Sequence, residues 1–298
     1  MLIAISINAM CICAVNCFIL ISGYFKIKVS PSKYFYIIFS LLIYAILLTI
    51  IPYIIQGSYN KAIRYSLFLS HSTYWFVIDY LFLMVFAPMI NLYYDKAAYS
   101  KRKILLLGLL IISCYFGFIW NHKANTNGYT IIQFITMYCI GRELRIRDYN
   151  KSTLTSLIIY LSSAALIAFS GYMLWAYSLN ELAWKITSYN NPFVILEAIG
   201  LFLLFKNINI YSRIINILAL SSFGIYLFQE SYLIKRVLCE WIQKQLYLGH
   251  DIWLAILMIS IGIAIIAIIF DQLRLSLLQL IIPKLQTFLE CKKARTDK

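Results

Sequence analysis

Three carboxylates lie inside long apolar runs, where acidic side chains are rare: Asp79, Glu197 and Glu230. A charge at the centre of a membrane-spanning helix costs roughly 2.5–3.5 kcal/mol on insertion scales, so such residues usually face a polar interior and take part in function. Asp79 shares a helix face with Trp75, four residues before it. We expect Asp79 to line a cavity, either as a general base or as a structural hydrogen-bond partner; the structural role is favoured for Glu197.

The histidines supply a second candidate base. His71, His122 and His250 all lie in or beside predicted loops, and His71 comes just before Trp75 at the start of an apolar run. His71 is therefore the alternative base, although a loop histidine is more often simply solvated. The cysteines in residues 11–17 have no nearby histidine and no paired CxxC spacing, so no metal site is expected.

The elements that must position these residues are membrane-spanning helices. Of the 298 residues, 62% are hydrophobic and 13% are charged, and the mean hydropathy is +0.79. A soluble domain carries about 25% charged residues, so the composition excludes almost any soluble enzyme. The net charge of +14 does not indicate a nucleic-acid partner, because the cations fall in short loops between apolar runs.

We therefore predict an all-α, polytopic transmembrane helix bundle embedded in the lipid bilayer. Nine apolar runs of suitable length are expected to span it: 2–24, 34–55, 73–92, 104–120, 129–142, 153–177, 193–208, 215–232 and 252–270. Residues 60–71 and 233–250 are expected to form interfacial helices. Residues 1–290 would form a single membrane domain, and residues 291–298 a charged tail.

The loop charges predict the orientation of this bundle. Nineteen of the 26 Lys and Arg residues fall in the loops after spans one, three, five and seven and in the tail, where Arg274 is counted. The positive-inside rule then places the C-terminus in the cytoplasm and, with nine spans, the N-terminus outside. Translocating residue 1 without a flanking polar segment is unusual, which suggests that one helix is missing from the front.

Four segments, in order, resemble the acyltransferase-3 family of integral membrane acyltransferases over about residues 14–270. They are Asn16 through Ser22–Gly23–Tyr24–Phe25; Tyr74–Trp75–Phe76 through Tyr80 to Pro88 and Asn91; Ile140–Gly141 to Arg145; and Asn191–Pro192–Phe193 through Phe205–Lys206 to Ser221–Ser222–Phe223–Gly224–Ile225–Tyr226–Leu227. The resemblance implies a ten-helix fold and transfer of an acyl group, usually acetyl, from cytoplasmic acyl-coenzyme A. The acceptor implied is a sugar hydroxyl of a surface polysaccharide or its lipid-linked precursor.

The resemblance also implies roles for individual residues. Three cations at the membrane edge, Lys26, Lys33 and Arg145, match family positions and suit the phosphates of coenzyme A; ordinary positive-inside signalling is the alternative. The implied substrate contacts are Asn16, Tyr24, Trp75, Gln229 and Glu230. Close helix packing is favoured for Ser22 and Gly23.

Two departures from the family pattern bear on activity. The family helix that carries an arginine and the histidine taken as the base would precede residue 1, and Phe228–Gln229 stands where a histidine often follows. Glutamine cannot take a proton near neutral pH. The leading hypothesis is an O-acyltransferase of the bacterial inner membrane. A truncated, inactive homologue is the alternative, and a lipid-linked sugar transporter or flippase is the third.

Overall fold

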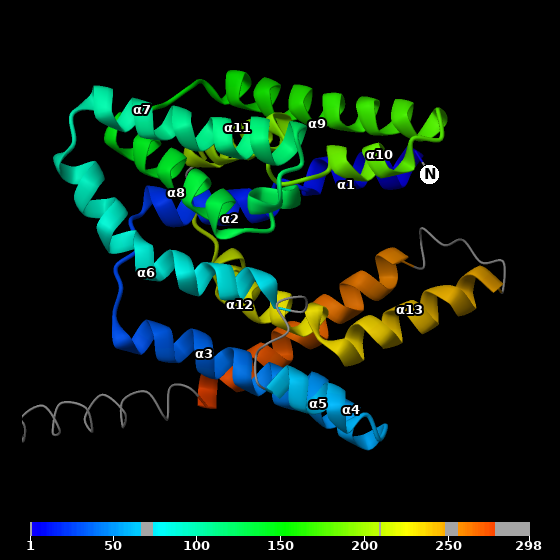
Figure 1. Cartoon of the computed structure of the whole chain (residues 1–298). Helices are drawn as coiled ribbons and strands as arrows, with labels where there is room; N and C mark the ends of the chain where they lie inside the picture. Colours follow the sequence, from blue (N-terminus) through cyan, green and yellow to red (C-terminus); the bar gives the residue numbers. More distant parts are fainter. Residues whose placement is uncertain (1, 67–73, 209, 248–255, 278–298) are drawn as a thin grey trace, which may run out of the picture. The chain divides into compact units, whose positions relative to one another are not determined.

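The computed structural model describes residues 2–66, 74–208, 210–247 and 256–277 (Figure 1). All regular elements in these ranges are helical, which confirms the predicted all-α class. The chain divides into two compact units. The first comprises Met1–Val29 and Asp79–Ile210, and the second comprises Ser30–Ile78 and Tyr211–Lys298. The predicted tail at 291–298 lies outside the described residues, and the single domain over 1–290 stays a prediction.

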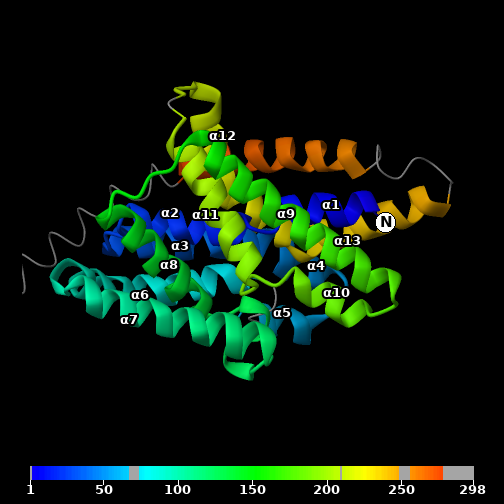
Figure 2. The ribbon, with the colours of Figure 1, turned by 90° about the horizontal axis from the view of Figure 1, so that it is seen from above.

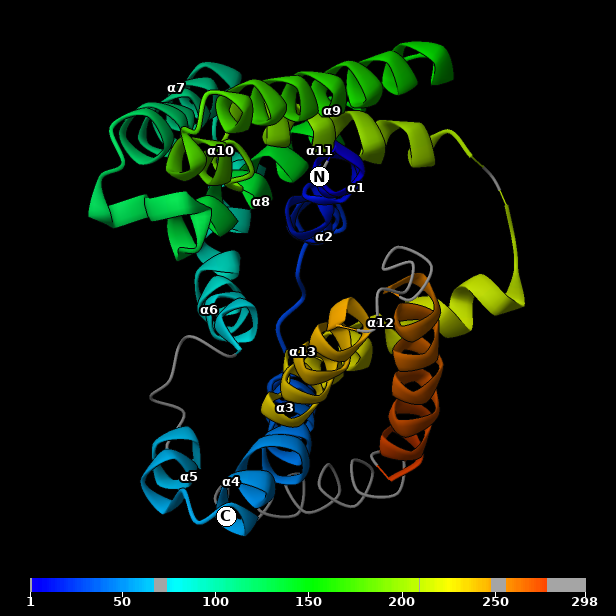
Figure 3. The ribbon, with the colours of Figure 1, turned by 90° about the vertical axis from the view of Figure 1, so that its right-hand side faces the viewer.

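The first unit is built from long helices and short connecting turns. Its elements are α1 (Leu2–Cys11), α2 (Ala14–Tyr24), α6 (Trp75–Lys96) from Asp79 onward, α7 (Tyr99–Leu110), the π-helix η2 (Ile111–Ile119), the 3-10 segment η3 (Lys123–Gly128), α8 (Ile131–Ile146), α9 (Thr153–Ala176), α10 (Asn180–Ile186) and α11 (Pro192–Lys206). Helices α1 and α2 follow each other along one line (Figure 2) and are seen almost end-on in Figure 3. Together they form one candidate span, Ile5–Tyr24.

Local sequence explains where several of these helices begin. Ser152 precedes α9 and its side chain accepts a hydrogen bond from the Thr155 backbone N–H. Asn191 precedes α11 and accepts from the Phe193 N–H, with Pro192 at the first helical position. Both are favoured N-terminal arrangements, because the capping oxygen satisfies an amide that the helix leaves unpaired and proline has no amide to satisfy.

Glycines allow the helices of the first unit to approach closely. A β-carbon on Gly141 of α8 would lie 2.8 Å from the Tyr24 backbone nitrogen of α2, and one on Gly23 of α2 would lie 2.9 Å from the Tyr138 Cα of α8. Likewise, a β-carbon on Gly200 of α11 would lie 2.7 Å from the Tyr160 nitrogen of α9. Since lipid provides no hydrophobic force between helices, such small-residue contacts hold membrane bundles together.

The second unit contains the remaining helices. They are α3 (Pro31–Ala45), the π-helix η1 (Ile46–Ile50), α4 (Ile51–Ile55), α5 (Tyr59–Ser66), α12 (Arg213–Glu230), α13 (Tyr232–Tyr247) and a last helix, Ile256–Leu277. Phe270 of the last helix packs on Tyr44 of α3 and on Phe228 of α12, with ring centroids 5.1 and 5.9 Å apart. Tyr53 of α4 stacks on Tyr232 of α13 at 4.0 Å. Aromatic contacts thus join the three parts of this unit.

Within the residues that the structure describes, six helical segments are long and apolar enough to cross a membrane. They are Ile5–Tyr24, Pro31–Ile55, Trp75–Lys96, Tyr99–Ile119, Thr153–Ala176 and Ile256–Leu277. Helices α12 and α13 pass the same test only as a pair bent by 68°. Helices α8 and α11 overlap two further predicted spans but have 16 and 15 residues. The length and apolar composition of these helices therefore indicate an integral membrane protein. The count of nine spans stays a prediction.

Candidate functional site

One end of the first unit carries a cluster of charged side chains. Asp95, near the end of α6, accepts from Lys26 Nζ at 2.5 Å and from Arg142 Nη2 of α8 at 2.7 Å. Glu143, the next residue on α8, accepts from Arg102 Nε of α7 at 3.1 Å and from Arg147 Nε at 2.6 Å. Each carboxylate thus pairs with two cations. Each set of one carboxylate and two cations therefore keeps a net positive charge.

Tyr24 at the end of α2 lies between two further cations. The Arg145 guanidinium carbon is 5.2 Å from the ring centroid and the Lys206 ammonium is 5.6 Å from it. Arg145 Nη1 also donates to the Tyr24 hydroxyl at 3.3 Å, a hydrogen bond that raises the pKa of Arg145. Arg145 is exposed and has no carboxylate within ion-pair distance in the described part of the chain, so it is free to bind an anion.

These six cations form what we call the cationic edge: Lys26, Arg102, Arg142, Arg145, Arg147 and Lys206. Only three carboxylates accompany them, because Lys206 pairs with Asp148 at 3.2 Å while Asp95 and Glu143 serve the others. Half of the positive charge is therefore unbalanced. Guanidinium groups in this number are suited to phosphate groups, whose oxygens match the planar fork of arginine.

A buried hydrogen-bond set holds the cationic edge in place. Tyr138 of α8 donates to Asn91 Oδ1 of α6 at 2.9 Å and accepts from the Ile27 backbone N–H at 3.1 Å. Asn91 Nδ2 in turn donates to the Ile27 carbonyl at 3.3 Å. The segment that carries Lys26 is therefore fixed to two helices. In the sequence, Asn91 stands out only as the last residue of a motif, and Tyr138 belongs to none of the four segments.

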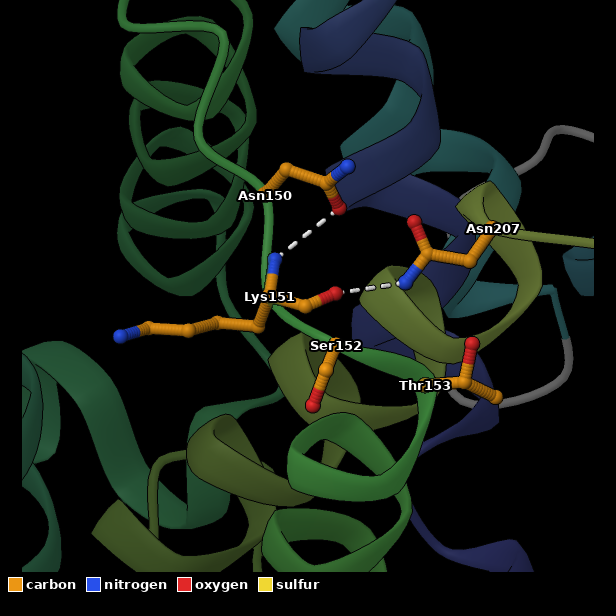
Figure 4. Close-up of a pocket in the computed structure, with 5 residues that line it drawn as sticks. All are labelled: Asn150, Lys151, Ser152, Thr153 and Asn207. Carbon is orange, nitrogen blue, oxygen red and sulfur yellow. Dashed lines mark hydrogen bonds between the residues drawn. The ribbon is translucent and has the colours of Figure 1, made fainter.

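A shallow pocket of about 390 Å³ lies beside the cationic edge (Figure 4). Its lining residues are Asn150, Lys151, Ser152, Thr153 and Asn207. They come from the turn before α9, from the first residue of α9 and from the residue that follows α11. All five side chains are polar, and the pocket adjoins Lys206 through its neighbour Asn207.

A family model described as an acyltransferase domain matches residues 1–271. The chain belongs to the acyltransferase-3 family. This match confirms the resemblance derived from the four sequence segments, and it supports a membrane-embedded acyltransferase. Searches of curated proteins and of solved structures returned no match.

In this acyltransferase, Asn16 lies in a buried polar network of the first unit. Asn16 Nδ2 donates to the Tyr189 carbonyl at 2.8 Å, and Gln133 Nε2 donates to Asn16 Oδ1 at 3.2 Å. Gln133 also bonds Ser113 of η2, which accepts from Asn125 Nδ2 at 3.0 Å. Asn16 is 1% exposed. Its predicted contact with substrate stays a prediction, and its visible role is to join α2 to α8.

A second pocket of the acyltransferase, of about 370 Å³, lies at the far end of the Tyr99–Ile119 span from the cationic edge. It is lined by Ile112, Phe116, Gly117, Trp120, His122 and Asn125. The Phe116 and Trp120 rings stack with centroids 5.7 Å apart. Apolar and aromatic walls with a few polar groups are typical of small-molecule sites.

The second unit contains a buried ion pair that the sequence analysis missed. Arg274 Nε donates to Asp271 Oδ1 at 2.7 Å, and the two side chains are 1% and 0% exposed. Arg274 also donates to Ser40 Oγ at 2.5 Å and Tyr36 OH at 2.9 Å, while Tyr44 OH donates to Asp271 at 3.1 Å. Arg274 is thus part of the interior and not of an exposed tail. In the sequence, the three-residue spacing of Asp271 and Arg274 directly after an apolar run was the signal that could have predicted this pair.

The remaining predicted site residues divide between the units. Of the three cations predicted for coenzyme A, Lys26 and Arg145 lie at the cationic edge, where Arg145 contacts Tyr24. Asp79 is buried on α6 within the first unit. Lys33, Trp75, Gln229 and Glu230 belong to the second unit, where Gln229 is exposed and Glu230 pairs with Lys235 at 2.6 Å. His71 lies outside the described residues. The roles proposed for all of these residues stay predictions.

Proposed function

We propose that this protein is a membrane O-acyltransferase that moves an acetyl or similar small acyl group from acyl-coenzyme A to a hydroxyl of a cell-surface polysaccharide or its lipid-linked precursor. Family membership over residues 1–271 supports acyl transfer. The observation that carries the donor is the cationic edge, where six cations accompany three carboxylates. Coenzyme A carries several phosphate charges, and an excess of arginine at one rim is suited to them.

The same edge supports the proposed orientation in the bacterial inner membrane. Loops rich in lysine and arginine remain on the cytoplasmic side, where acyl-coenzyme A is made. With the cationic edge in the cytoplasm, the aromatic pocket at Phe116 and Trp120 faces the opposite side of the membrane. Stacked aromatic rings offer a flat apolar surface to a sugar ring, which is consistent with a glycan acceptor.

The reaction requires a base for the acceptor hydroxyl, and we propose Asp79. A carboxylate on a membrane helix is expensive to insert and is retained where it serves a function. Its neighbour Tyr80 bonds Ser22 of α2, with the two hydroxyl oxygens 3.3 Å apart, so this part of α6 contacts the segment that leads to the cationic edge. His71 is the second candidate, and general-base catalysis typically contributes about 10²–10⁴-fold to the rate.

The test uses membranes that contain the full chain, radiolabelled acetyl-coenzyme A, and recovery of label in the polysaccharide and lipid-linked sugar fractions. We expect Arg145→Gln to raise KM for acetyl-coenzyme A about tenfold, because the variant removes a positive charge that faces the donor phosphates. Lys101→Gln, which removes an exposed cation of α7 outside the cationic edge, is the matched control and should leave KM within twofold. Asp79→Asn should lower kcat at least 100-fold with little change in KM.

Three outcomes would contradict the proposal. If the wild-type chain transfers no label to either fraction, an inactive homologue becomes the better interpretation. If Arg145→Gln and Lys101→Gln behave alike, the donor does not bind at Arg145. If Asp79→Asn retains full kcat, the base lies elsewhere.

A further inference from the structure

The polar pocket beside the cationic edge is held open by two loops that bond each other. Asn207 Nδ2 donates to the Lys151 carbonyl at 2.7 Å, and Lys206 Nζ donates to the Tyr149 carbonyl at 3.0 Å. Lys206, the last residue of α11, and Asn207, which follows it, therefore fix the turn that leads into α9. Figure 4 shows the first of these bonds crossing between the loops, with the side chains of Asn207 and Thr153 on the same side.

The lining offers unused hydrogen-bonding groups of both kinds. Asn150 Oδ1 accepts from the Lys151 backbone N–H at 2.9 Å, and Asn150 Nδ2 makes no hydrogen bond within the described residues. Asn207 uses its Nδ2, and its Oδ1 has no partner among them. The pocket therefore presents one free amide donor and one free amide acceptor. A nucleobase edge carries the complementary acceptor and donor, and asparagine amides commonly read adenine.

The charges around the pocket are also suited to a nucleotide. No carboxylate is among its five lining residues. The Lys151 ammonium extends away from the two carboxamides toward solvent, 5.6 Å from the Tyr149 ring centroid (Figure 4). On the other side, Lys206 reaches both the pocket loop and the Tyr24 ring, which Arg145 also contacts. Cations thus flank the pocket on two sides, and its volume falls within the usual range of about 300–1,000 Å³ for ligand sites.

We propose that this pocket binds the nucleoside end of the acyl-coenzyme A donor. Asn150 and Asn207 hydrogen-bond the adenine, Lys151 binds the 3′-phosphate at the rim, and the diphosphate runs past Lys206 to Arg145. This assignment rests on the proposed function, because it takes acyl-coenzyme A as the donor. It adds residues that the family resemblance did not assign. It also orients acyl-coenzyme A along the cationic edge, with its nucleoside at the end nearest α9.

The experiment measures equilibrium binding to the full chain in lipid nanodiscs. The probes are acetyl-coenzyme A, dephospho-acetyl-coenzyme A, which lacks the 3′-phosphate, and adenosine 3′,5′-bisphosphate. We expect Lys151→Met to raise the Kd of acetyl-coenzyme A and of the bisphosphate about tenfold and to leave that of the dephospho compound within twofold. Lys101→Met removes an exposed cation of the same type away from the pocket, so it should change no Kd by more than twofold.

A second variant tests base recognition. Asn150→Ala should raise the Kd of all three nucleotide probes about fivefold. Because Asn150 is exposed and its side chain bonds only the adjacent Lys151 N–H, the variant is expected to fold normally.

The outcomes separate this assignment from the proposed function. If wild-type protein binds acetyl-coenzyme A and its dephospho analogue equally well, the assignment of the pocket is overturned and the proposed function stands. The same follows if Lys151→Met weakens the binding of both compounds equally. Binding of ATP in preference to the bisphosphate would point to a different nucleotide and also overturn it. Failure of wild-type protein to bind acetyl-coenzyme A would overturn the proposed function and, with it, the assignment.

Discussion

The ion pairs of this protein differ at the residue scale in how much water reaches them. Lys26 and Asp95 are 39% and 41% exposed, whereas Arg274 and Asp271 are 1% and 0% exposed. Exposed pairs contribute about 0–1 kcal/mol because water and salt screen them. A buried charge that loses its partner is strongly destabilising, since no water replaces the lost contact. The same type of interaction is therefore open to water at the cationic edge and buried within the second unit.

The buried pair gives a prediction about stability. Asp271→Asn leaves the Arg274 charge without its carboxylate, so we expect the free energy of unfolding to fall by about 3–5 kcal/mol. Glu240→Gln makes the same acid-to-amide change in the exposed Arg236–Glu240 pair, and we expect almost no change in the melting temperature, because water screens the exposed pair. Thermal melting of the purified protein in detergent measures both. Similar melting temperatures for the two variants would show that Asp271 is not a structural anchor.

At the scale of elements, helix contacts depend on the absence of side chains. Helices α2 and α8 meet through two glycines, Gly23 and Gly141, each lying against the backbone of the other helix. This contact brings Tyr24 and Arg145 to the same end of the first unit, where they form part of the cationic edge. The geometry of the proposed donor site therefore depends on two positions that themselves carry no chemistry.

A pair of glycine substitutions tests this dependence. Gly141→Ala forces α2 and α8 apart because backbone atoms cannot yield as a flexible side chain does, so we expect about 1–3 kcal/mol of destabilisation and weaker donor binding. Gly108 of α7 has open space around its Cα, and Gly108→Ala should be neutral or stabilising by up to about 1 kcal/mol. Melting temperatures and the Kd of acetyl-coenzyme A should both separate the variants. Identical behaviour would mean that the glycine contact is dispensable.

The whole molecule consists of two units, each assembled from separate stretches of the chain. Helix α6 contributes to both, because the first unit resumes at Asp79 while the helix begins at Trp75. In the first unit, α8 has only 16 residues, about 24 Å at 1.5 Å per residue, which is shorter than the roughly 30 Å of a bilayer core. Most of its central residues are buried by other helices, so its ends need not meet lipid.

The membrane topology provides a test at this scale. If α8 crosses the bilayer, the turns at its two ends lie on opposite sides of the membrane. In a variant whose native cysteines are replaced by serine, we expect Asn150→Cys to react with an impermeant maleimide only from the cytoplasmic side, and Asn127→Cys only from the outer side. Reaction of both from the same side would show that α8 is re-entrant and would reduce the span count below nine.

The sequence alone predicts the elements better than the contacts between them. Apolar runs indicate the helices well, because spanning segments must bury their backbone in hydrogen bonds of their own. The apolar run predicts a last span that ends at residue 270, with Arg274 counted in the tail, whereas the helix continues to Leu277. Their burial depends on Ser40 and Tyr44. That partnership joins residues far apart in the chain, and local composition cannot reveal it.

The same limit applies to the candidate site. Lys26, Tyr24 and Arg145 were found through motif resemblance, and the structure brings them together. The polar pocket could not be predicted, because the sequence around Asn150, Lys151 and Asn207 is typical of any polar loop. The pocket forms only where the hydrogen bond from Asn207 to the Lys151 carbonyl joins two loops. Asn16 was assigned to substrate by resemblance, and its network with Gln133 depends on packing that no spacing rule encodes.

The hydrogen bond between Ser40 and Arg274 joins residues 234 positions apart and has a consequence for biosynthesis. At about 5–20 residues per second, the ribosome needs roughly 10–50 s after Ser40 to reach Asp271 and Arg274, the partners of Tyr44 and Ser40. The first unit is complete once Ile210 has emerged, so it can assemble while α3 still lacks its final contacts. During that interval the polar face of α3 must be shielded by the insertion machinery or by lipid headgroups, until helix Ile256–Leu277 supplies Asp271 and Arg274.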